Sequence, residues 1–274
     1  MPAILLHLIP ASLYALLGLH FWHSRWRAAA PVTHHGMLPW ERGTLLLALA
    51  SHGLSLQHAF FAGGGMHFGF SQALSLMLWL ALLFYWVESL YARLEGLHAL
   101  GLPIAAFCAL LPAAFPGQHL ENAASPLFRA HFVVAMLAYS LFTLAALHAM
   151  LMSVAERRLH HARLTKALAS LPPLLTMETL LFRLIGIAFV LLTLTLGSGV
   201  LFSEELFNQA FRLDHKTVFA LASWVLFGTL LVGRRAWGWR GKRALRLTLA
   251  GFITLMLAYV GSRFVLEVVL GRLA

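Results

Sequence analysis

The chain has 274 residues, of which 60% are apolar and only 11% are charged, and its mean hydropathy is +0.80. A soluble domain carries roughly 25% charged residues, and a compact core of this size cannot bury so much apolar surface. Cys108 is the only cysteine, which excludes a disulfide-stabilised secreted scaffold. The composition therefore predicts an integral membrane protein with room for about seven to nine spanning helices.

Eight long apolar runs, bounded by charges or by Pro and Gly clusters, are expected to be membrane-spanning helices. The runs are continuously apolar rather than alternating, which excludes a transmembrane β-barrel. No loop between them is long enough for a soluble domain, so we expect one all-α membrane domain over residues 1–274, a polytopic helix bundle. The predicted spans are about Pro2–Trp22, Gly43–Phe61, Phe68–Tyr91, Leu97–Phe115, Leu127–Val154, Thr179–Phe202, Thr217–Gly233 and Leu245–Gly271.

The loop charges predict the orientation of these spans. The positive-inside rule assigns the basic set of loops to the cytoplasm, so both termini are expected outside. The net charge of +10 then reflects topology and contact with anionic membrane lipids, and nucleic-acid binding is not expected. Fourteen of the twenty Lys and Arg residues lie in the basic set: Arg25, Arg27, Arg42, Arg93, Arg157, Arg158, Arg163, Lys166, Arg234, Arg235, Arg240, Lys242, Arg243 and Arg246.

Histidine is unusually frequent, with fifteen residues against ten Asp and Glu together. Eight of the fifteen, including His98 and His148, fall at or beyond the predicted cytoplasmic ends, and we expect them to be interfacial background. His52 alone is expected near mid-membrane, where an ionisable residue is costly and indicates a functional site by default. Two interpretations of His52 stay open: a ligand or proton-relay group, or a neutral imidazole hydrogen-bonded within the bundle.

Two further histidines are expected at the outward ends of helices. His131 opens the fifth span, and His215 precedes the seventh. Two neutral imidazoles that face each other across a gap can ligate a haem iron from both sides; the alternative is two unrelated interfacial residues. The nearby basic side chains could pair with haem propionates, because basic groups suit carboxylates: these are Arg129, Arg212 and Lys216.

The sequence offers no support for a catalytic function. It contains no P-loop, no GxSxG nucleophile elbow, no HExxH zinc motif and no CxxC pair. We therefore expect no catalytic residues and no enzyme activity.

Several segments resemble the cytochrome c assembly membrane protein family, most closely its small YpjD-like branch, which is related to CcsA-like and HemX-like proteins. The stretch from His131 to His148 resembles a family span that begins with an outward-facing histidine and carries Tyr eight residues later. The resemblance is strongest over about 127–270. The other segments that carry it are Leu191–Phe202, Leu213–Trp224, Gly238–Lys242 and Ala258–Arg263.

The resemblance implies haem handling at the outer face of a bacterial inner membrane, with non-covalent haem b as the cofactor. It also implies partnership with other cytochrome c assembly or haem-handling membrane proteins, and His131 matches the outward haem ligand of the family. Two departures stand out: no Trp occurs between Gly199 and His215, and Tyr259–Arg272 contains no His. We therefore do not expect a complete haem-attachment motif.

The leading prediction is an inner-membrane protein that binds or relays haem, with His131, His215 and His52 as candidate axial ligands of the iron. A cofactor-free accessory or scaffold membrane protein is the first alternative. The second is a small-solute transporter that uses His52 as a proton relay.

Overall fold

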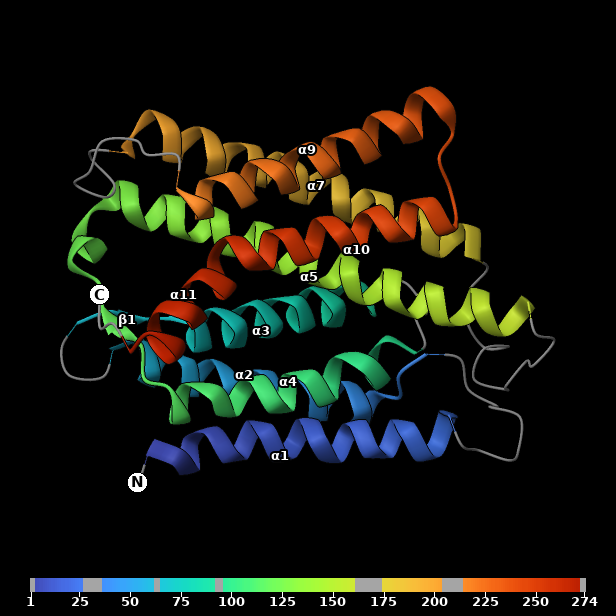
Figure 1. The fold of residues 1–274 in the computed structure, drawn as a ribbon. Helices are drawn as coiled ribbons and strands as arrows, with labels where there is room; N and C mark the ends of the chain where they lie inside the picture. The colour runs from blue at the N-terminus through green and yellow to red at the C-terminus, as the bar shows by residue number, and fades with distance from the viewer. Residues whose placement is uncertain are drawn as a thin grey trace.

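The computed structural model describes residues 3–26, 36–61, 65–91, 96–160, 174–203 and 214–271, which are almost entirely helical (Figure 1). A two-residue antiparallel ribbon joins β1 (His67–Phe68) to β2 (Gln118–His119), and the 3-10 turn η2 (Glu121–Ala124) follows. The π-helical turn η1 (Trp22–Trp26) extends α1, while η3 (Leu257–Gly261), α11 (Ser262–Phe264) and η4 (Val265–Val269) extend α10. The eight long helices of the described residues are α1 (Ala3–Phe21), α2 (Pro39–Phe61), α3 (Phe70–Glu88), α4 (Leu97–Ala114), α5 (Pro126–His160), α7 (Leu174–Leu201), α9 (His215–Trp237) and α10 (Lys242–Met256).

The all-α polytopic bundle predicted from hydropathy is confirmed. Among the described residues, seven helical segments are long and apolar enough to cross a membrane. The eighth long helix, α2, is not one of them, because polar residues such as His52, Gln57 and His58 lie within its apolar sequence. It packs against α1, α3 and α4.

The two ends of the bundle differ in charge. Both chain termini lie at the same end, together with the β1–β2 ribbon and the beginnings of α5 and α9; we call this the terminal end (Figure 1). The opposite, basic end carries side chains such as Arg25, Arg42, Arg234 and Lys242. By the positive-inside rule, the terminal end is the one expected outside.

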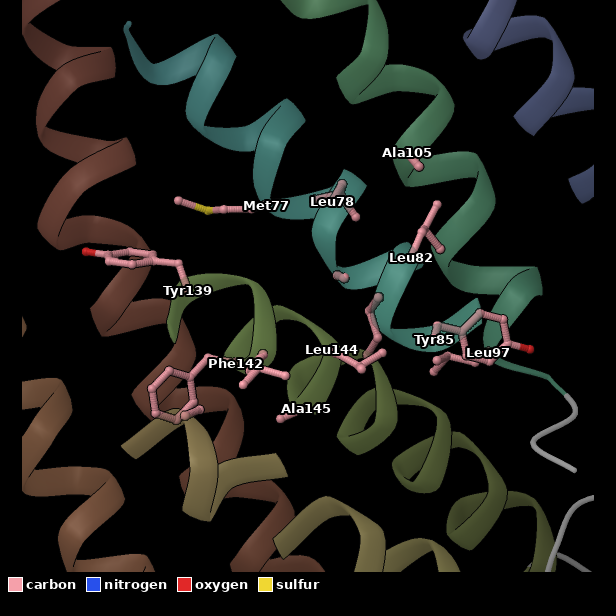
Figure 2. Packing of buried hydrophobic residues seen from close by; sticks show 14 of the residues in the cluster. Met77, Leu78, Leu82, Tyr85, Leu97, Ala105, Tyr139, Phe142, Leu144 and Ala145 are labelled. Carbon is pink, nitrogen blue, oxygen red and sulfur yellow. The ribbon is translucent and has the colours of Figure 1, made fainter. Parts of the chain in front are cut away.

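Helix α5 is the most buried of the candidate spans. In its most apolar window, 67% of the residues are buried, against 22% in α7 and in α9. Figure 2 shows Tyr139 and Leu144 of α5 beside Met77 and Leu82 of α3. On another side, Phe142 stacks on Phe227 of α9 with ring centroids 3.9 Å apart. Since lipid tails are as apolar as Leu, such close packing is what holds membrane helices together.

A buried carboxylate fixes the basic end of α1 to the beginning of α2. Glu41 is 1% exposed and accepts a 2.6 Å hydrogen bond from Nη2 of Arg25. Its carboxylate also accepts a 2.7 Å hydrogen bond from the backbone N–H of Leu38 and lies 3.0 Å from Nε2 of His20. One carboxylate therefore compensates a buried guanidinium and orders the start of the next helix.

Replacing Glu41 with Ala is expected to lower the free energy of unfolding by about 3–5 kcal/mol, because it leaves the buried guanidinium of Arg25 without its counter-charge. Thermal unfolding in detergent, followed by circular dichroism, measures the loss. Arg246→Ala is the matched control, since that side chain is exposed on α10 at the same end of the bundle. Equal melting temperatures for the two variants would contradict this role.

Candidate functional site

The terminal end of α5 holds His131 in a defined orientation. His131 is half-buried, and its Nδ1 lies 2.8 Å from the hydroxyl of Ser198 on α7. That hydroxyl also lies 3.1 Å from the carbonyl of Thr195. When its hydrogen is donated to this carbonyl, its oxygen accepts from Nδ1–H of His131, and Nε2 is then the ring nitrogen with the lone pair that a metal ion uses.

An aromatic cluster lies at the same end of the bundle as His131. Phe68 of β1 is 1% exposed, and its ring centroid lies 4.7 Å from that of Phe132, the residue after His131. Tyr259 of η3 and Phe60 of α2 each lie 5.8 Å from Phe68, centroid to centroid. The ribbon inserts Phe68 between helices that are distant in sequence, so the interior of the terminal end is closely packed and aromatic.

Cationic side chains gather at the same end. Lys216, at the beginning of α9, is within range of electrostatic interaction with Arg263 of α11. Nε of Arg263 is buried without a hydrogen-bond partner among the described residues, and its Nη1 is 3.9 Å from Glu267. The sequence alone places Arg263 near this end of the last span, but only the three-dimensional packing shows that its Nε is buried without a hydrogen-bond partner among the described residues. Lys216 and Arg263 together suit a carboxylate ligand.

His215 occupies a more open position than His131. It is the exposed first residue of α9. Asp214 caps this helix by accepting 2.9 Å hydrogen bonds from the N–H and hydroxyl of Thr217. Partial burial acts to raise the pKa of Asp214, but these hydrogen bonds and the charges of Lys216 and His215 outweigh it, so the pKa is lowered. The beginning of α9 is thereby fixed, with His215 at the surface.

The remaining predicted cationic residues are placed differently. Arg129 is exposed and donates from Nε to the carbonyl of Ala123 at 2.7 Å, which holds it against the preceding turn. Arg212 lies outside the described residues. The structure therefore places Lys216 near another cation, but gives Arg129 a local backbone partner.

His52 is enclosed within the bundle, away from the terminal-end cluster. It is fully buried, with Nδ1 3.3 Å from the hydroxyl of Tyr14 on α1 and Nε2 2.8 Å from the hydroxyl of Ser75 on α3. Because both ring nitrogens are engaged, an iron could bind only after one hydrogen bond broke. This geometry favours the interpretation of His52 as a neutral, hydrogen-bonded core residue.

Two histidines expected to be interfacial are instead buried. Nδ1 of His98 lies 3.0 Å from the hydroxyl of Tyr85, within hydrogen-bond distance. The His98 ring packs on Phe21, with ring centroids 3.8 Å apart. His148 places Nε2 3.6 Å from a carboxylate oxygen of Glu88. Sequence reasoning missed this burial because their partners come from other helices.

No group of three or more His, Cys, Asp or Glu side chains that could hold a metal ion occurs among the described residues. A multi-ligand metal centre of the usual protein type is therefore absent from this part of the chain. Haem places different demands on the protein, because the porphyrin supplies four ligands and the protein needs to supply only axial ones.

Comparison with known proteins identifies related sequences. The inner membrane protein YpjD of Escherichia coli (strain K12) is 34% identical over 151 residues, which cover 55% of this chain and 56% of that protein. An uncharacterized 28.8 kDa protein of Azospirillum brasilense is 36% identical over 143 residues, 52% of each chain. The cytochrome c biogenesis protein CcsA of Gloeobacter violaceus is 30% identical over 92 residues, 34% of this chain and 27% of that protein.

The chain thus aligns with about half the length of the first two of these relatives, and no solved structure matches it. The similarity to YpjD and the apolar helices identify a multi-pass protein of the inner membrane. The protein family described as Cytochrome C assembly protein matches this chain over residues 40–270, from the beginning of α2 to the end of η4. The chain therefore belongs to the cytochrome c assembly protein family.

Proposed function

We propose that this protein binds haem b non-covalently at its terminal end, with His131 as an axial ligand, and relays it to other haem-handling membrane proteins. The observation that carries the proposal is the hydrogen bond between His131 and Ser198, which fixes the imidazole and is compatible with the tautomer needed for ligation. Metal-binding histidines almost always donate their second ring nitrogen in this way.

The surroundings of His131 also fit haem. The rings of Phe132 and Tyr259, which are only partly buried, would offer the porphyrin an apolar surface, and Lys216 and Arg263 would offer cations for the propionates. Arg129 and Arg212 remain proposed propionate partners from their sequence positions. The bound group would supply an iron centre, while the chain's own residues hold and orient it.

His215 is the proposed second axial ligand, because α9, which begins at His215, and α5, whose first turns carry His131, begin at the same end of the bundle (Figure 1). Its exposed position suits a ligand that is released when haem is handed on. The absence of Trp between Gly199 and His215 favours holding and relay over covalent attachment to an apocytochrome. His52 is left out of the proposed ligand set, since Tyr14 and Ser75 occupy its nitrogens.

Replacing His131 with Ala is expected to abolish haem binding, because the oriented axial ligand is lost. Haem titration of the purified protein in mild detergent, followed at the Soret band, measures this. His119→Ala is the control, since His119 lies at the same end but in the β1–β2 ribbon, against His67. A wild-type protein without a Soret band after haem addition would favour the cofactor-free scaffold instead.

Replacing Ser198 with Ala is expected to weaken haem affinity by about tenfold without removing the ligand, because the hydrogen bond that fixes the imidazole is lost. The same titration gives the dissociation constant. Ser153→Ala on α5 is matched to it, since that hydroxyl bonds only to the carbonyl of Ala149 on its own helix in the described contacts. Unchanged affinity in Ser198→Ala would show that this hydroxyl does not orient the ligand.

Replacing His52 with Ala is expected to leave the haem spectrum unchanged and to lower the free energy of unfolding by about 1–3 kcal/mol. The physical reason is that two buried hydroxyls, of Tyr14 and Ser75, lose their partner. Absorption spectra and thermal unfolding of the same preparation separate the two effects. Loss of the haem bands in a still-folded His52→Ala protein would restore His52 as a ligand.

A further inference from the structure

A groove opens between α7 and α9 on the side of the bundle. It has a volume of about 770 Å³, and its walls include Phe182, Phe189, Val190 and Val225. Figure 1 shows α7 and α9 together at one edge of the bundle. Both helices are mostly exposed along their apolar lengths, with 22% of each window buried. In a membrane, this face and its groove meet lipid rather than water.

Two glycines shape the groove. At Gly186 a Cβ atom would meet no other atom within 4 Å, so open space lies directly over the backbone of α7. At Gly228, on α9, a Cβ would come within 3.4 Å of the Phe189 ring. The absence of a side chain at Gly186 leaves room for a long, narrow apolar group beside α7, and the Phe189 ring packed over Gly228 forms part of the wall.

The same groove carries positive charge that the described part of the protein does not neutralise. Arg183, Arg234 and Arg235 all line it. Glu178 lies 2.5 Å from Nη1 of Arg234 and 3.3 Å from Nε of Arg240. Across the described ranges, no carboxylate forms an ion pair with Arg183 or Arg235, and both side chains are exposed.

The position of these arginines matches the depth of lipid headgroups. Arg183 is nine residues into the 28-residue helix α7, which is about 42 Å long and so exceeds a hydrocarbon core of about 30 Å. Its flexible side chain can extend toward the basic end of the bundle, where Arg235 lies two residues before the end of α9. An arginine exposed to lipid requires an anionic partner, and a phosphodiester headgroup is the anion present at that depth.

We propose that the α7–α9 groove binds an anionic phospholipid. Its phosphate is held by Arg183 and Arg235, and one acyl chain lies along the space above Gly186 and beside Phe189. The combination of an apolar groove with unpaired cations at one end matches the amphipathic structure of a phospholipid. This site is separate from His131 and does not depend on the proposed haem binding.

Native mass spectrometry of the protein released from nanodiscs of equal phosphatidylglycerol and phosphatidylethanolamine tests the proposal. The wild type is expected to retain phosphatidylglycerol preferentially. Arg183→Gln is expected to reduce the retained phosphatidylglycerol roughly fivefold, as the loss of one lipid-facing cation implies. Arg246→Gln removes an exposed arginine of the basic end that does not line the groove, and it is expected to retain the wild-type amount.

A second variant tests the apolar part of the site. Gly186→Leu places an apolar side chain in the groove, at a position where a Cβ atom meets no other atom within 4 Å, and it is expected to abolish retention. Gly43→Leu is its control, because Gly43 is also a helical glycine with nothing within 4 Å, but it lies on α2. Equal retention of the two lipids by the wild type, or full retention by Arg183→Gln, would overturn the proposal. A doubled protein mass that Gly186→Leu abolishes would assign the groove to a second copy of the chain and overturn it as well.

Discussion

The packing of α5 into the middle of the bundle is the constraint on which the other features depend. Its residues contact α3, α7 and α10, and small side chains such as Ala138 and Ala145, both fully buried, allow neighbouring backbones to approach. In a bilayer this close contact replaces the hydrophobic driving force available in water. His131 therefore projects from a fixed helix, and Ser198 from a neighbour that is packed extensively against it.

Hydropathy predicts the helices of this protein well, because the signal is local and each span needs only its own apolar residues. Helix α2 has a weaker apolar signal, because polar residues such as Glu41 and His52 lie along it, although the pattern still predicts a span over Gly43–Phe61. Glu41 explains how such a helix is stable: its carboxylate is satisfied by Arg25 and by a backbone N–H. Compensation of this kind requires partners from other segments, so a window along the sequence does not reveal it.

The candidate site was predictable only in part, for the same reason. The outward position of His131 follows from the helix pattern, but its hydrogen-bond partner is 67 residues further along the chain. His52 shows the opposite outcome: its predicted depth marks it as unusual, yet Tyr14 and Ser75, 38 and 23 residues away, satisfy both nitrogens. Sequence position thus identifies costly histidines, whereas three-dimensional contacts distinguish a proposed ligand from a core residue.

The helices of the bundle differ in how deeply they are buried, and their proposed roles differ accordingly. Buried α5 supplies the proposed axial ligand, while α7 lies between it and the lipid: Ser198 faces His131 at the terminal end, and Arg183 and Gly186 face the membrane nearer the basic end. One helix therefore contacts both the proposed haem ligand and the proposed lipid. Ser198 and Arg183 are 15 residues apart on α7, about 22 Å along the helix axis, so the two proposed sites share one helix without sharing a residue.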